Sequence, residues 1–190
     1  LKIDYPDGKE FAVCLTHDID VLNYSRIGIV TDVGRHLLHG QWKDALRRPF
    51  YNVNKKWNPW WKFKEIMDLE EEHGAKSTFF IMGLEKGDQD FNYQAEDLSH
   101  ELGEIVDRGW EVGLHGCHKA YRDFEDLKRQ KVNLERALGK KVLGFRNHYL
   151  RFKVSETWEL LSMAEFEYDA TFGYADCAGF RNGMCHPFKS

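Results

Sequence analysis

From about residue 59 onward, short apolar runs alternate with longer stretches in which apolar residues recur every three or four positions. The short runs predict buried strands, and the longer stretches predict helices with one face in the core. Predicted strands cover residues 11–15, 77–82, 110–114, 142–145 and a short segment near 168; predicted helices cover residues 59–72, 96–108, 123–138 and 155–164. Strands that alternate with helices predict a mostly parallel sheet, hence an α/β fold.

The first third of the chain departs from this alternation. Pro6-Asp7-Gly8 has turn chemistry and predicts a hairpin between residues 2–5 and 11–15. Residues 21–58 are rich in aromatic side chains, with helical patterns at 27–38 and 42–47, and we interpret them as a helical insertion above the core. The length of 190 residues predicts one domain over residues 1–190.

Polar side chains gather where the predicted strands end. The segments that follow the strands are His17-Asp18-Ile19-Asp20, His115-Gly116-Cys117-His118, Arg146-Asn147-His148-Tyr149 and Asp169-Ala170-Thr171. In parallel sheets the chemistry lies at the carboxyl ends of the strands, so we expect these acids, imidazoles and the guanidinium to meet at one rim.

The residue types in these segments suggest a metal centre. Asp18 and Asp20 are two positions apart in an extended segment and therefore share a side. Asp20, His115 and His118 would supply one carboxylate and two imidazoles, a set typical of hydrolytic zinc. The alternative is that a D-x-D pair and two loop histidines only form hydrogen bonds.

The remaining polar residues have plainer alternatives. Arg146 would hold the free carboxylate of Asp18 ionised, or would form an ordinary structural ion pair. His148, Asp169 and His186 are candidates for proton transfer or orientation, and each alone is equally a satisfied polar residue. Cys117 has no base assigned to it, and we interpret it as a packed thiol.

Five segments in order resemble the polysaccharide deacetylase family, also called the NodB homology or carbohydrate esterase family 4 domain. They are Leu15-Thr16-His17-Asp18-Ile19-Asp20, Ser77-Thr78-Phe79-Phe80 with Gly83, Glu111-Val112-Gly113-Leu114-His115 with His118, Gly144-Phe145-Arg146 with Tyr149, and Tyr168-Asp169-Ala170-Thr171. The resemblance implies an irregular (β/α) barrel with mostly parallel strands, in which Asp18 is the catalytic base, Asp20 binds metal, and Arg146 and Tyr149 line the substrate groove.

The same resemblance implies a zinc-dependent or other divalent-metal hydrolase that removes N-acetyl or similar acyl groups from an amino sugar or polysaccharide. Three departures from the family pattern stand out. His118 follows His115 by three positions rather than four, His148 stands near the usual proline of the arginine motif, and the last motif has no clear match before Ser190. Either the chain is a fragment, with the barrel incomplete at its C-terminus, or His186 or His148 has taken the role of the general acid.

Two other functions fit the same residues: a non-catalytic carbohydrate-binding relic, and a hydrolase of small or cyclic amides. The net charge of −4 without a basic stripe argues against nucleic acid as a partner. The resemblance implies a carbohydrate substrate, an N-acetylated amino sugar. No apolar run is long enough to span a bilayer, and the chain start lacks a secretion-signal layout. With four cysteines and no CxxC pair, the expected location is the cytoplasm, with reduced thiols.

Overall fold

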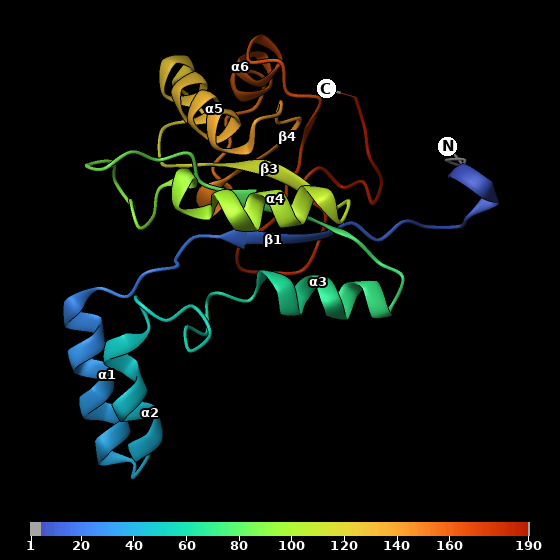
Figure 1. The fold of residues 1–190 in the computed structure, drawn as a ribbon. Coiled ribbons are helices and arrows are strands. Elements are labelled where there is room, and N and C mark those ends of the chain that lie inside the picture. The colour runs from blue at the N-terminus through green and yellow to red at the C-terminus, as the bar shows by residue number, and fades with distance from the viewer. Residues whose placement is uncertain (1–4, 190) are drawn as a thin grey trace.

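The computed structural model describes residues 5–189 and contains one parallel β-sheet with the strand order β1-β2-β3-β4-β5 (Figure 1). The strands are β1 (Leu15–Ile19), β2 (Ser77–Ile81), β3 (Glu111–Gly116), β4 (Gly144–Asn147) and β5 (Tyr168–Asp169). Each pairs in parallel with the next. The predicted α/β class and parallel arrangement are therefore confirmed. Within the described residues the sheet is open, with β1 and β5 at its edges.

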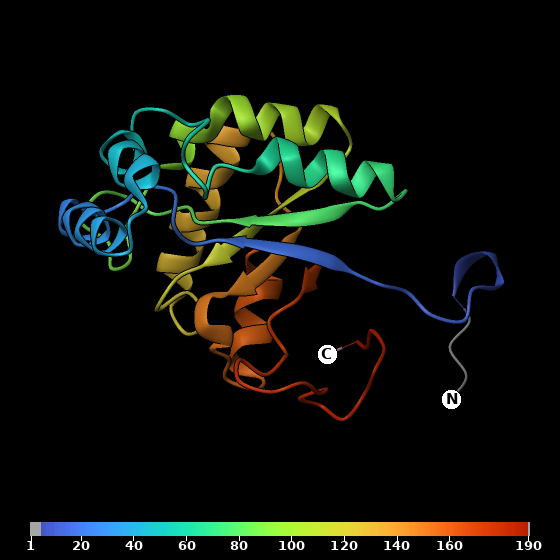
Figure 2. The same ribbon diagram turned by 90° about the horizontal axis from the view of Figure 1, so that it is seen from below.

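Helices pack against the apolar face of this sheet, and α3 and α4 lie side by side there (Figure 2). The main helices are α3 (Phe63–Glu72), α4 (Ser99–Asp107), α5 (Phe124–Leu138) and α6 (Glu156–Met163), with 3-10 segments at Ala95–Leu98 and His148–Leu150. Met67, Ile105 and Leu127 from three of the helices share one buried core with Phe79 and Leu114 of the sheet. Each fully buried side chain of this size contributes roughly 1.5–3 kcal/mol, so this core fixes the sheet on which the polar residues stand.

The opposite face of the sheet carries polar residues. Thr16 and Asp18 of β1 point to this face, and Arg146 of β4 reaches both of them. Gly113 of β3 lies between, and a Cβ atom there would come within 2.5 Å of the Phe80 ring. The Arg146 guanidinium stacks on that ring at 4.8 Å, so the missing side chain at position 113 keeps the path from β4 to β1 open.

Residues 21–58 form the helical pair α1 (Arg26–Leu38) and α2 (Trp42–Arg47), followed by a 3-10 turn at Arg48–Phe50. The pair projects from the sheet on the side to which the carboxyl end of β1 points, as both ribbon views show (Figure 1, Figure 2). Its base is held by the Asn58 side-chain amide, which donates 2.7 Å to the Leu22 carbonyl, and by Asn92, which accepts from the Leu22 and Asn23 amides at 2.7 Å. The helical character predicted for this segment agrees with the structure.

The predicted N-terminal hairpin is wrong within the described residues. Pro6–Gly8 is a 3-10 turn, and the first strand begins at Leu15 rather than at Phe11. The side chains of Phe11 and Val13 are 71% and 70% exposed. The physical reason is pairing: β2 begins at Ser77, which is opposite Leu15, so the preceding residues have no strand beside them. Residues 1–4, part of the predicted first hairpin strand, lie outside the described residues.

The helices and the cysteines of the described residues bear on two further features of the sequence. Within the described residues, no helix has both the length and the apolar composition needed to cross a bilayer. All four cysteines are free, and Cys117 alone is buried.

Candidate functional site

The two acids predicted at the first strand lie on one face of β1. Asp18 is within the strand and Asp20 follows it directly. In an extended chain the Cα atoms of two such residues are about 6.5 Å apart, and their side chains point to the same face. His17 points the other way, and its Nε2 lies 2.8 Å from Oε1 of Glu70 on α3. His17 therefore belongs to the packing between β1 and α3, while Asp18 and Asp20 face the polar side.

Asp18 is paired with Arg146. The guanidinium Nη1 donates to Asp18 Oδ1 over 3.0 Å and to the Thr16 hydroxyl over 2.8 Å, and Nε donates to the Ala170 carbonyl over 3.1 Å. Four points therefore fix the guanidinium, counting its stacking on Phe80. Asp18 keeps one oxygen without a partner among these contacts and a side chain that is 32% exposed, so it can meet a small molecule.

Three side chains at the carboxyl ends of β1, β3 and β4 converge on one point. Asp20 Oδ1 lies 3.1 Å from His115 Nε2 and 3.5 Å from His148 Nδ1, and the two imidazole nitrogens are 3.1 Å apart. Asp20 Oδ1 is buried and accepts no hydrogen bond. A buried carboxylate oxygen without a donor is costly, and a cation between these three atoms would satisfy it.

The protonation states of this cluster also suit a cation. Contact with the His115 imidazole lowers the pKa of the Asp20 carboxyl, against the opposing effect of burial. Burial lowers the pKa of the His148 imidazole, which therefore stays neutral at neutral pH. One carboxylate and two imidazoles are the ligand set of many hydrolytic zinc sites, which keep further positions for water and substrate.

His118, predicted to be the third metal ligand, lies in a separate cluster with Asp90 and Cys117. Its Nδ1 is 2.5 Å from Asp90 Oδ2 and 3.7 Å from Cys117 Sγ. Burial raises the pKa of the Cys117 thiol to about 11, which keeps it protonated at neutral pH and supports its interpretation as a packed thiol. The structure thus brings His148, and not His118, to Asp20 and His115.

Asp90 connects the two clusters and was not among the predicted site residues. Its Oδ2 lies 3.9 Å from His148 Nε2, the nitrogen on the far side of the ring from Asp20. A carboxylate there favours the tautomer with hydrogen on Nε2, which leaves the Nδ1 lone pair free for a cation. Asp90 lies in the loop after β2 with a left-handed φ of 66°. No motif in that loop signals its role.

The position of His148 depends on the unusual backbone that follows β4. Tyr149 and Leu150 have φ values of 58° and 49°, in the left-handed region that residues other than glycine rarely adopt. The chain therefore reverses directly after His148, and the Tyr149 ring stacks on the His148 ring with a centroid distance of 3.9 Å. Strained backbone of this kind, with a cost of about 1–3 kcal/mol per residue, is frequent at functional sites. Tyr149 is 58% exposed beside the cluster.

Asp169 lies behind the site rather than in it. Its Oδ1 accepts hydrogen bonds from the Thr171 amide, at 3.0 Å, and from the Thr171 hydroxyl, which in turn accepts from the Asn147 amide at 2.9 Å. Burial raises the pKa of Asp169 to about 6. Asp169 thus supports the residue that precedes His148. His186 contacts the Pro187 carbonyl at 3.0 Å, and the described contacts bring it to none of the other predicted site residues.

The comparisons with known proteins now decide the family. A family model described as polysaccharide deacetylase matches residues 60–168, more than half of the chain. The chain belongs to the polysaccharide deacetylase family. The segment matched by the family model includes His115, Arg146 and His148, and it starts after Asp18 and Asp20. A search of curated proteins finds no match.

A solved structure from Mycobacterium smegmatis shares the fold of this chain. A protein from Mycobacterium smegmatis, assigned as a polysaccharide deacetylase, is 22% identical with a TM-score of 0.58, over 90% of this chain and 55% of that one. The wild-type CE4-family pseudoenzyme from Bacillus anthracis is 19% identical (TM-score 0.43, 56% and 37% covered), and IcaB from Ammonifex degensii is 21% identical (TM-score 0.42, 55% and 52% covered). The chain spans about half the length of the Mycobacterium smegmatis protein.

Proposed function

We propose that this chain is a divalent-metal-dependent deacetylase that hydrolyses the N-acetyl or a similar acyl group of an amino sugar. One observation carries the proposal: Asp20 Oδ1, His115 Nε2 and His148 Nδ1 converge within 3.5 Å, and the carboxylate oxygen has no hydrogen-bond donor. These three residues fit a cation by donor type and proximity. The family match supports the reaction class.

A bound divalent cation, for which zinc is our first expectation, would supply Lewis acidity that polarises the acyl carbonyl and activates water. Asp18 accepts the proton from the attacking water, because it is a partly exposed carboxylate close to Asp20 with one oxygen free of the contact with Arg146. Arg146 holds Asp18 in place through the hydrogen bond from its Nη1. Both nitrogens of His148 face other groups, so we assign to Asp18 the return of the proton to the departing amine. His186 was also predicted as a general acid, and its role in protonating the amine stays a prediction.

Metal content separates His148 from His118 as the third ligand. We expect about one metal ion per chain, by elemental analysis, in the wild-type protein and in His118→Ala, and almost none in His148→Ala. Acetate release from N,N′-diacetylchitobiose should require that metal and disappear with a chelator. Retention of metal in His148→Ala with loss in His118→Ala would reverse the ligand assignment, and a metal-free active enzyme would refute the proposal.

Two alternative functions predict other results in the same assay. Stoichiometric metal without acetate release from any amino sugar would indicate a non-catalytic carbohydrate-binding protein. Release of acyl groups from small or cyclic amides, with amino sugars left intact, would indicate a different hydrolase on the same fold.

A further inference from the structure

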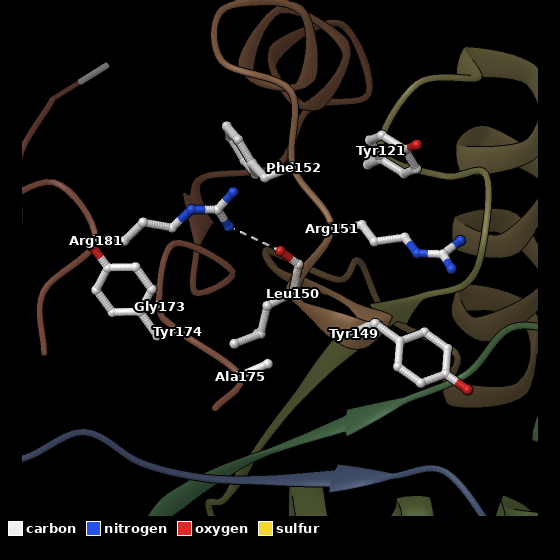
Figure 3. A pocket seen from close by; sticks show the side chains of 9 residues that line it. All are labelled: Tyr121, Tyr149, Leu150, Arg151, Phe152, Gly173, Tyr174, Ala175 and Arg181. Carbon is white, nitrogen blue, oxygen red and sulfur yellow. Dashed lines mark hydrogen bonds between the residues drawn. The ribbon is translucent and has the colours of Figure 1, made fainter. Parts of the chain in front are cut away.

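A cavity of about 540 Å³ is lined in part by Tyr149 (Figure 3). The Tyr149 ring packs against His148, which together with Asp20 and His115 forms what we call the cation cluster. Its walls come from residues 149–152 after β4, residues 173–181 of the C-terminal segment, and Tyr121. Tyr149 joins the two places, because it lines the cavity and also stacks on His148 at 3.9 Å. A molecule that reaches the cation cluster across Tyr149 would therefore extend into this cavity.

The cavity is positively charged. Arg151 and Arg181 both line it, whereas no acidic residue does. Arg181 Nη1 donates to the Leu150 carbonyl at 3.0 Å, and Arg151 Nη1 donates to the His118 carbonyl at 3.4 Å. Within residues 5–189 neither guanidinium is in ion-pair contact with a carboxylate. The chain has a net charge of −4, and six of the eleven arginines of the described region pair with acids; Arg151 and Arg181 are among the five that do not.

The arrangement of the arginines suits an anion. Figure 3 shows the Arg181 guanidinium and the Tyr174 ring on one side of Leu150, and the Arg151 guanidinium and the Tyr149 ring on the other side. Each guanidinium keeps donors free after its single backbone bond, and such donors bind carboxylate or phosphate oxygens in bidentate fashion. Tyrosine rings next to them offer flat surfaces for sugar faces. Contacts with backbone carbonyls restrict the two side chains, so less entropy is lost when a ligand binds.

We propose that this cavity binds an anionic group, carboxylate or phosphate, carried by the saccharide whose acyl group lies at Asp18. This inference rests on the proposed function for the acylated sugar and adds the substrate class: an N-acylated saccharide with a negative charge close to the acylated unit. A neutral N-acetylated saccharide would leave both guanidinium groups without an anionic partner.

Binding measured by calorimetry on the full chain tests this inference without turnover. Two matched pairs serve as probes: N-acetylglucosamine 6-phosphate against N-acetylglucosamine, and the glucuronic acid–N-acetylglucosamine disaccharide against N,N′-diacetylchitobiose. We expect the charged member of at least one pair to bind about tenfold more tightly or better. The pair with the larger preference identifies phosphate or carboxylate as the bound group.

Variants connect the preference to the cavity. Arg151→Gln and Arg181→Gln should each reduce the preference for the charged probe about tenfold, and Arg151→Lys should keep part of it. Arg136→Gln on the exposed side of α5 is the matched control and should change neither probe. Thermal unfolding checks that Arg181→Gln, which loses a backbone contact, is still folded.

Equal affinity within both pairs would overturn the inference, and so would a preference that survives in both glutamine variants. Acetate release is read separately. If the charged probes bind preferentially through Arg151 and Arg181 while no probe releases acetate, the anion site stands and the proposed deacetylase function fails. If neutral probes are deacetylated without any charge preference, the function stands and the anion site fails.

Discussion

Arg146 donates a hydrogen bond to Asp18 over 3.0 Å, although 128 residues separate the two along the chain. β2 and β3 lie between their strands, and the guanidinium crosses them above Phe80 and Gly113. The pair therefore reports that all four strands have formed in the correct register. It also places a fixed positive charge beside the proposed base.

The first prediction concerns Asp18. Asp18→Asn cannot accept the proton of water and should lower acetate release by a factor of ~10² to 10⁴, because general-base catalysis typically contributes that much. Metal content should stay at the wild-type value, since Asp18 is not in the cation cluster. Arg146→Lys retains a positive charge without the planar fork and should give an intermediate rate. An Asp18→Asn variant with most of its activity would remove Asp18 as the base.

Asp90 provides the second prediction. Asp90→Asn removes the negative charge behind His148 Nε2, and changes at such supporting positions typically cost ~10- to 100-fold in metal affinity. Competition with a chelator of known affinity measures the change. Asp107→Asn, an exposed position at the end of α4, is the control and should bind metal as the wild type does. Unchanged affinity in Asp90→Asn would show that His148 is oriented without Asp90.

The third prediction concerns stability as a function of pH. Burial raises the pKa of Asp169 to about 6, above the usual value for an aspartate in an unfolded chain. Its contribution to stability is therefore fully present below about pH 4 and is lost as the pH rises through 6. A shift of this size corresponds to roughly 2–3 kcal/mol. Asp169→Asn keeps a carbonyl oxygen for Thr171 and should remove this component, so the difference in unfolding free energy between variant and wild type should grow between about pH 4 and 7. A difference that stays constant over this range would contradict the assigned shift.

The fourth prediction uses two glycines with different surroundings. A Cβ atom at Gly83 would lie 2.0 Å from the Gln130 carbonyl oxygen on α5, so Gly83→Ala must push the helix away and should cost at least ~2 kcal/mol of unfolding free energy. Gly103 lies on the exposed side of α4, and a methyl group added there would have nothing within 4 Å. Gly103→Ala should instead stabilise the protein by about 0.5–1 kcal/mol. Denaturant titration measures both, and equal effects would contradict the close approach at Gly83.

The sequence predicted the elements with strong periodicity well. The β-rich run that became β2 and the charged helix that became α5 lie within one or two residues of their predicted bounds. The end of α5 was predictable because Gly139 adopts a left-handed conformation there, which glycine does easily. The run that starts at Phe11 misled the prediction, since apolar composition alone does not show whether a neighbouring strand is present. Pairing with β2 sets the start of β1 at Leu15.

Part of the candidate site could also be predicted from the sequence. Asp18, Asp20, His115 and Arg146 follow from strand periodicity and the position of strand ends. The arrangement of His118 and His148 does not, because it depends on the left-handed backbone at Tyr149, which residue propensities disfavour. Asp90 comes from a loop, and its contact with His148 is a product of tertiary packing.

The reversal of the chain at Tyr149 and Leu150 aims His148 at the cation cluster and Arg151 at the cavity within four residues. A shift of either residue into an ordinary backbone conformation would turn both side chains away together. The proposed cation site and the proposed anion site therefore depend on the same backbone turn. Redesign of the protein for another sugar would do better to alter the C-terminal wall of the cavity and to leave this turn intact.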